Sequence, residues 1–412
     1  MNKRWLNIAF LYLFIVAIIG ITLRLMGFVP INFNYAYLLH THSHIAFLGW
    51  LYNVLFVILI DTFLLPTEKN KKIYPHLFWI TQIANIGMLC SYPLQGYGLY
   101  SISFSTLHII CSWFFVYTFL KDVKKANIHT DRNMLAIRFI KAALFFMVLS
   151  SLAPFCMAPV TKIAGAGSNL YYNTIYFYLH FQYNGWFTFA VLGLFFKLLE
   201  NNKINYHQKL AKYFYWLMLI ACVPAYFLST LWTKPVAIIY VISVVAAILQ
   251  LIALCYFLKL INNIPKKFIT SLHKWVLFLF YCSLLCFSIK NILQFFGAFP
   301  SVASYAYKVH NFIIGYLHII FIGFLSFFVI AYLIKEKELY LSKMCKAGLF
   351  LFIAGFIFSE IILFAQGAYV LLNQNVFPLY AEAIFYFSLP MVIGIGLIVI
   401  DRFFFAHKSL KA

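Results

Sequence analysis

The chain has 412 residues, of which 64% are hydrophobic, 21% aromatic and only 10% charged, with a mean hydropathy of +0.90. Soluble proteins average about 25% charged residues, so this composition excludes a water-soluble enzyme. The net charge of +21 would suit nucleic-acid binding, but the placement of the cations gives another reason for it. The eight cysteines show no CxxC, CxxCH or paired spacing, which predicts buried thiols rather than disulfides, structural zinc or covalently attached haem.

Apolar stretches long enough to cross a bilayer, about 20 residues each, recur along the whole chain. The first is too long for the apolar part of a signal peptide and lacks an A-x-A cleavage site, so we expect a helix of the mature protein. The links are short, which predicts one all-α, polytopic membrane domain over residues 1–412. The twelve predicted transmembrane helices run roughly over Trp5–Met26, Tyr37–Leu65, Ile73–Pro93, Tyr100–Leu120, Met134–Ala153, Tyr171–Leu199, Leu210–Trp232, Val236–Ile261, Phe268–Gly297, Tyr307–Ile334, Met344–Leu372 and Leu379–Phe405.

The basic residues alternate between loops in a way that predicts the topology, because cytoplasmic loops collect Lys and Arg. The opposite loops hold only Lys162, Lys234, Lys308 and, near a helix end, Arg24. We therefore predict a multi-pass protein of the bacterial inner membrane with both termini in the cytoplasm. Its predicted partner is the lipid bilayer and not nucleic acid. The cations assigned to the cytoplasmic side are Lys3, Arg4, Lys69, Lys71, Lys72, Lys121, Lys124, Lys125, Arg132, Lys203, Lys209, Lys212, Lys266, Lys267, Lys335, Lys337, Lys343, Lys346, Lys408 and Lys411.

One short sequence motif, called the phrase below, occurs three times, and its period defines a repeat. Each copy has His, an aromatic residue at +3, Gly at +5 and an aromatic residue at +6, and the copies begin at His44, His180 and His318. The intervals are 136 and 138 residues. Self-similarity at a fixed period is the mark of an internal repeat. We predict three four-helix pseudo-repeats, at about 1–133, 134–267 and 268–412, with the histidines on helices 2, 6 and 10.

The twelve histidines divide by depth. Ionisable groups inside a bilayer are costly, so a cluster of them at one depth indicates a functional site, and neutral imidazole is a common metal ligand. The alternative is a polar network that joins the repeats. His76, His129, His207, His273 and His407 belong to the cytoplasmic loops, whereas His40, His42, His44, His108, His180, His310 and His318 lie in the predicted outer half.

The spacing of the first three histidines separates them into two groups. Residues four apart share a face of a helix, whereas residues two apart point in nearly opposite directions. We therefore expect His40 and His44 on one face of helix 2 and His42 against another neighbour, so that one helix can serve two sites.

With this arrangement, the chain resembles the catalytic subunit I of haem-copper oxidases. Leu39-His-Thr-His42 through Phe56 is similar to the helix 2 segment of cbb3-type oxidases, Tyr178-Leu-His180 to the helix 6 segment, and Gly315-Tyr-Leu-His318 to the helix 10 segment. Nitric oxide reductases and NnrS-type haem proteins are related comparisons. The resemblance covers the whole chain in architecture but is local in sequence.

The resemblance implies haem b, with His42 or His44 and His318 as the two ligands of one low-spin iron. His180 matches a ligand of the family's copper site, and His108, His310 and His40 are further candidates near a second metal site. The family's adjacent His pair on helix 7 is missing, because Leu210–Trp232 has no His. The position of the high-spin haem ligand is Tyr316. A copper centre is therefore not expected, and no catalytic residue is assigned.

Several polar residues inside the predicted helices have open roles. Lys290, with Asn291 and Gln294, is a candidate for binding a haem propionate, and the alternative is that Lys290 snorkels to the interface. Glu360 and Gln366 either relay protons or pair with Lys290.

The sequence leads to a membrane-embedded b-type haem protein that transfers electrons or binds a diatomic gas such as O2 or NO, with a degenerate copper site. Its expected partner is a cytochrome c or a quinol-linked redox protein. Whether it is an enzyme of the oxidoreductase class stays open. The alternatives are a twelve-helix secondary transporter, although such folds usually have two related halves, and a cofactor-free assembly or sensor protein on the same fold.

Overall fold

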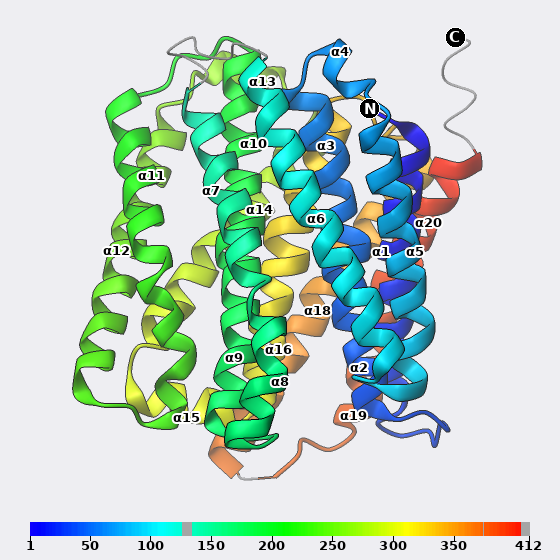
Figure 1. Ribbon diagram of the computed structural model, residues 1–412, viewed down its shortest axis with the longest axis vertical. Coiled ribbons are helices and arrows are strands. Elements are labelled where there is room, and N and C mark those ends of the chain that lie inside the picture. The colour runs from blue at the N-terminus through cyan, green and yellow to red at the C-terminus, as the bar shows by residue number, and fades with distance from the viewer. Residues whose placement is uncertain (126–133, 374, 405–412) are drawn as a thin grey trace. The chain divides into compact units, whose positions relative to one another are not determined.

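The computed structural model describes residues 1–125, 134–373 and 375–404, and every regular element in them is a helix (Figure 1). Within these ranges, ten helices are long and apolar enough to cross a membrane. The protein is therefore a polytopic helical membrane protein. The ten spans are Lys3–Leu25, Tyr35–Phe63, Leu99–Lys125, Leu135–Ala164, Gln208–Thr233, Ala237–Asn262, Lys274–Phe296, His310–Lys335, Lys343–Leu372 and Tyr380–Phe404.

The other two predicted spans also exist as long helices, but they are more polar. One is α5 (Ile73–Gln95), and the other is the continuous segment Asn169–Asn201. Buried amides occur in both, such as Gln82 in the first and Asn184 in the second. Their place in a membrane, and so the count of twelve spans, stays a prediction.

The chain forms two compact units. Unit 1 comprises residues 1–127 and 332–412, so it joins the first predicted pseudo-repeat to the C-terminal helices, and unit 2 comprises residues 128–331. That the whole chain is one membrane domain stays a prediction. The helices of unit 1 are α1 (Lys3–Leu25), α2 (Tyr35–His44), η1 (Ile45–Tyr52), α3 (Asn53–Phe63), α4 (Pro66–Lys69), α5, α6 (Leu99–Lys125), α18 (Lys343–Asn373), α19 (Tyr380–Tyr386) and α20 (Leu389–Phe404).

Unit 2 contains the remaining helices, and α17 (Phe327–Lys335) crosses its boundary with unit 1. Its core is made where α7 packs on η3 and α10, and where α12, α14 and η5 meet. These helices are α7 (Met134–Ser150), α8 (Ala153–Ala164), α9 (Asn169–His180), η3 (Phe181–Phe187), α10 (Thr188–Asn201), α11 (Gln208–Cys222), η4 (Pro224–Thr233), α12 (Ala237–Asn262), α13 (Lys266–Ser271), α14 (Lys274–Phe296), α15 (Pro300–Lys308), α16 (His310–His318) and η5 (Ile319–Ser326).

Some predicted boundaries are wrong because short turns interrupt the apolar runs. Phe268 belongs to the separate short helix α13, and the span begins only at Lys274. Tyr307 likewise belongs to α15, and the span begins at His310. Hydrophobicity continues across these breaks, so composition alone does not show them.

A π-helix begins directly after the histidine of each of the three phrases. These are η1 after His44, η3 after His180 and η5 after His318. At the end of the second and third, the hydroxyls of Thr188 and Ser326 donate to the carbonyls five residues earlier. π-Helices are rare and are frequent at functional sites. The phrase predicted from sequence therefore has a common backbone form.

The glycines of the first two phrases are sites of close helix contact. A Cβ on Gly49 would lie 2.9 Å from the Tyr12 ring of α1, and one on Gly185 would lie 2.5 Å from Cβ of Phe146 on α7. Small residues allow such close approach in membrane helices.

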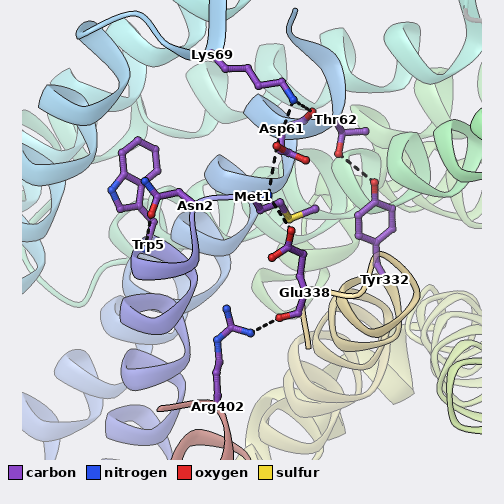
Figure 2. A network of polar contacts seen from close by, with 9 residues as sticks. All are labelled: Met1, Asn2, Trp5, Asp61, Thr62, Lys69, Tyr332, Glu338 and Arg402. Atoms are coloured by element: carbon purple, nitrogen blue, oxygen red, sulfur yellow. Dashed lines mark hydrogen bonds and ion pairs between the residues drawn. The ribbon is translucent and has the colours of Figure 1, made fainter. Parts of the chain in front are cut away.

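Polar side chains connect the helix ends on one side of unit 1 (Figure 2). Asp61 lies between the Met1 amino group, at 3.5 Å, and Lys69 Nζ, at 3.2 Å. The Met1 amino group is also 2.8 Å from Glu338 Oε1, and Arg402 Nη1 donates to the carbonyl oxygen of Glu338. Lys69 is one of the cations that were assigned to the cytoplasm. Of the other loop residues in that prediction, His129, Arg132, His407, Lys408 and Lys411 lie outside the described residues.

All eight cysteines are free thiols, as predicted, but they are not all buried. Cys90, Cys156 and Cys255 are exposed on the protein surface, so the prediction of buried thiols is wrong for these three. An apolar surface that faces lipid accommodates such residues.

Candidate functional site

The helix that carries His40, His42 and His44 presents them to two neighbours, and this confirms the prediction from their spacing. The His40 ring lies 4.6 Å from the Tyr97 ring, and His44 Nε2 is hydrogen-bonded to the Tyr97 hydroxyl at 3.2 Å. His42 instead faces α1, where its Nδ1 bonds to the carbonyl of Val16.

Tyrosines hold the imidazole of His44 on one side of α2. The His44 ring stacks on Tyr92, with 4.5 Å between centroids and 18° between planes. Tyr92 and Tyr97 come from the end of α5 and the turn after it, where Gly96 has φ of +58°. A Cβ on Gly96 would lie 2.5 Å from the Tyr37 ring, so glycine at this position allows the turn to bring Tyr97 against the two histidines.

His108 lies near His44 and its neighbouring tyrosines but has no hydrogen bond to them. It is 1% exposed, and its ring lies 4.6 Å from the Tyr52 ring. Within the described part of the chain, neither His108 Nε2 nor the Tyr52 hydroxyl has a hydrogen-bond partner. His40 and His108 both lie close enough to His44 to act on it electrostatically. His40, His44 and His108 therefore form one cluster with Tyr52, Tyr92 and Tyr97.

His42 has a fixed tautomer. Its Nδ1 lies 3.1 Å from the Val16 carbonyl oxygen, which can only accept a hydrogen bond. The proton is therefore on Nδ1, and the lone pair is on Nε2. Gly20, one turn after Val16 on α1, makes room for the ring, because a Cβ there would lie 2.9 Å from His42 Cε1.

His180 is hydrogen-bonded through both ring nitrogens. Nε2 donates to the Cys222 carbonyl at 2.8 Å, and Nδ1 accepts from Asn184 Nδ2 at 3.1 Å. The ring is 1% exposed. This is the pattern of a packed imidazole, and a metal at His180 would have to replace one of the two bonds.

Lys290 is fully buried in unit 2, which is contrary to the alternative that it snorkels to the interface. Its side chain is 0% exposed, and Nζ lies 5.9 Å from the centroid of the Phe287 ring. Among the described residues, Nζ has no hydrogen-bond partner. It lies close enough to His180 and Cys222 to act on both electrostatically.

The histidines of the third phrase lie at the two ends of α16. His310 is its first residue and is exposed, whereas His318 is its last residue, is partly buried and directly precedes η5. His318 belongs to unit 2, and His42 and His44 belong to unit 1. The pairing of His318 with either of them stays a prediction.

Glu360 and Gln366 have partners within unit 1. Glu360, on α18, interacts electrostatically with Arg24 on α1. Gln366 Oε1 accepts a hydrogen bond from the backbone N–H of Phe377 at 3.0 Å. Glu360 therefore lies close enough to balance the charge of Arg24, which the sequence places near a helix end.

No group of three or more His, Cys, Asp or Glu side chains in the described ranges is placed to hold a metal ion. No family model matches the chain, and no curated protein matches it. The function has to be argued from the geometry of these residues.

Sequence reasoning did not find the residues that position the histidines. Val16 and Gly20 on α1, and Tyr92 and Tyr97 around α5, occupy ordinary apolar or aromatic positions. The only local signal is Gly96, which marks a turn beside two tyrosines.

Proposed function

We propose that the chain is a membrane-embedded b-type haem protein in which His42 would be a ligand of the haem iron. The observation that carries the proposal is the bond from His42 Nδ1 to the Val16 carbonyl. Metal-binding histidines usually donate their other ring N–H to a carbonyl or carboxylate, which fixes the tautomer and the orientation of the ring.

The geometry favours His42 over His44, an alternative that the sequence left open. In His42, Nδ1 contacts a backbone carbonyl, the kind of partner that orients metal-binding histidines, and Nε2 would be the nitrogen that binds iron. In His44, Nε2 is itself hydrogen-bonded to Tyr97, and the ring is stacked on Tyr92. His44 is therefore assigned to the tyrosine cluster.

Two residues of unit 2 are further candidates from the sequence. His318 is the second ligand that the resemblance implies. It is the last residue of α16 and directly precedes the π-helix η5. Lys290, the candidate for a propionate, is a buried cation without a hydrogen-bond partner in the described ranges. A buried charge without a partner is costly, so an anionic group beside Lys290 would stabilise it.

A bound haem b would supply one-electron transfer or diatomic-gas binding, and the protein groups would set its ligation and its surroundings. The proposal includes twelve spans in three four-helix repeats, an inner-membrane location with cytoplasmic termini, and a cytochrome c or quinol-linked partner. His180, with both nitrogens hydrogen-bonded, is assigned a structural role rather than copper ligation.

The test is a reduced-minus-oxidised visible spectrum, with a pyridine haemochrome assay, of protein expressed with ample haem. We expect the sharp α-band of a bis-histidine haem b. His42→Ala should remove this band, and added imidazole should restore part of it. His76→Ala, which changes an exposed histidine bonded to its own helix, is the control and should leave the spectrum unchanged.

Two results would overturn the proposal. Folded, monodisperse protein without any haem would favour the transporter or the cofactor-free alternatives. Loss of the band in His44→Ala but not in His42→Ala would assign the ligand to His44.

A further inference from the structure

Unit 2 contains an apolar cavity of about 100 Å³ next to α13. Its walls come from α10, α12, α14, η5 and α17, and residues of α13 itself close one side. Examples are Leu199, Phe257, Leu284 and Phe328, and Ser283 and Tyr281 are the only lining residues with polar side-chain atoms. A cavity lined by Leu, Ile and Phe stays dry and binds apolar guests.

The short helix α13 has apolar residues toward this cavity and exposed lysines at its start. Phe268, Ile269 and the following Leu272 line the cavity. Lys266 and Lys267 are exposed at the start of the same helix. Such a division, with an apolar face inward and lysines outward, is typical of helices that lie in the plane of a membrane interface.

The lysines around α13 have no acidic residue near them in sequence. Between Glu200 and Glu336 the chain contains no Asp or Glu, although it contains eleven Lys or Arg. Lys266, Lys267 and Lys274 are all exposed beside the cavity wall. A counter-anion for them therefore has to come from outside this stretch of chain.

We propose that the cavity takes part of an acyl chain of an anionic phospholipid, whose phosphate is bound by Lys266 and Lys267. The lining matches a hydrocarbon chain, and the flanking cations match a negatively charged head group. Clusters of basic residues at membrane interfaces, and basic pockets between membrane helices, bind anionic lipid head groups. The proposal is independent of haem binding, because none of its residues is a candidate haem ligand.

Native mass spectrometry of the purified full chain tests the proposal by titration with two lipids. Dioleoyl-phosphatidylglycerol and dioleoyl-phosphatidylcholine have the same acyl chains and differ in head-group charge. We expect one phosphatidylglycerol to bind about 30-fold more tightly than phosphatidylcholine, since each of the two lysines near an anionic lipid head group contributes about a fivefold gain.

Variants separate the head-group contact from the cavity. Lys266→Gln with Lys267→Gln should remove the preference, lowering phosphatidylglycerol affinity about 30-fold and leaving phosphatidylcholine nearly unchanged. Lys209→Gln with Lys212→Gln removes the same charge from exposed positions of α11 and should keep the preference. Leu284→Trp fills the cavity and should weaken both lipids.

The proposal fails if the wild-type protein binds both lipids equally, or if the α11 control loses the preference as fully as the α13 variant. It also fails if Leu284→Trp, shown to be monodisperse, binds both lipids as before. Displacement of both lipids by a prenyl quinone, with no dependence on Lys266 and Lys267, would assign the cavity to a neutral isoprenoid instead.

Discussion

Gly20→Ala tests whether the orientation of His42 matters for haem binding. The added Cβ would lie 2.9 Å from His42 Cε1, where ordinary contacts begin at 3.4 Å, so the ring has to move about 0.5 Å away from α1. Val16 is also on α1, and the same movement lengthens the 3.1 Å bond from His42 Nδ1 to about 3.6 Å. A contact of that length is no longer a hydrogen bond.

The expected effects on stability and on affinity differ. Alanine in place of glycine inside a helix stabilises by about 0.5 to 1 kcal/mol, and the lost hydrogen bond costs about 0.5 to 1.5 kcal/mol. The free energy of unfolding should therefore change little. Loss of the partner that orients a metal-binding histidine lowers metal affinity by about 10- to 100-fold, so haem binding should weaken by that factor.

The assay is the rate of haem transfer from the purified protein to an excess of an apo-globin. The matched control is Gly396→Ala, whose Cβ would lie 3.1 Å from the Phe14 ring on the same helix α1 but near no histidine. Haem loss should be about 10- to 100-fold faster in Gly20→Ala than in the control. Equal rates in the two variants would refute the reasoning.

Two further predictions concern stability. His180→Leu leaves the Cys222 carbonyl without its donor and Asn184 Nδ2 without its acceptor, so it should lower the free energy of unfolding by about 2 kcal/mol or more, measured by denaturant titration, with haem content per folded chain unchanged. Haem loss without destabilisation would instead make His180 a ligand. Lys71, in the link before α5, bonds to Asp122 and Glu68, and these carboxylates raise the pKa of Lys71 to about 12. The pKa of Lys71 is higher in the folded state than in the unfolded state. The free energy of unfolding lost in Lys71→Met should therefore be constant below about pH 10 and should vanish as pH rises toward 12. A constant difference between wild type and variant across that range would contradict the assignment.

The sequence predicts the helices well because their signal is local. Apolar runs and short links place the long helices of the described residues, although several boundaries are wrong. The spacing of His40, His42 and His44 correctly separates their faces. The contacts between helices are a different matter, since periodicity shows which residues share a face but not what that face meets. Nothing in the sequence pairs Arg24 with Glu360, or brings Tyr97 to His44.

The π-helices are a second limit. A rule based on four-residue spacing holds through α2, but it fails after His44, where the backbone changes to a wider helix. The phrase around each histidine was visible as a repeat of residue types, whereas its backbone form required coordinates. The tautomer of His42 likewise depends on a carbonyl that every residue carries, so no side-chain pattern indicates it.

The backbones of α18 and α20 touch directly. A Cβ on Gly394 would lie 2.5 Å from the carbonyl oxygen of Gly348, and one on Gly355 would lie 2.3 Å from the backbone nitrogen of Met391. With no side chain between them at these points, the two helices cannot slide or separate by changing rotamers, as helices packed through leucine can. A displacement of α20 is therefore transmitted directly to the backbone of α18, which carries Glu360 five residues after Gly355.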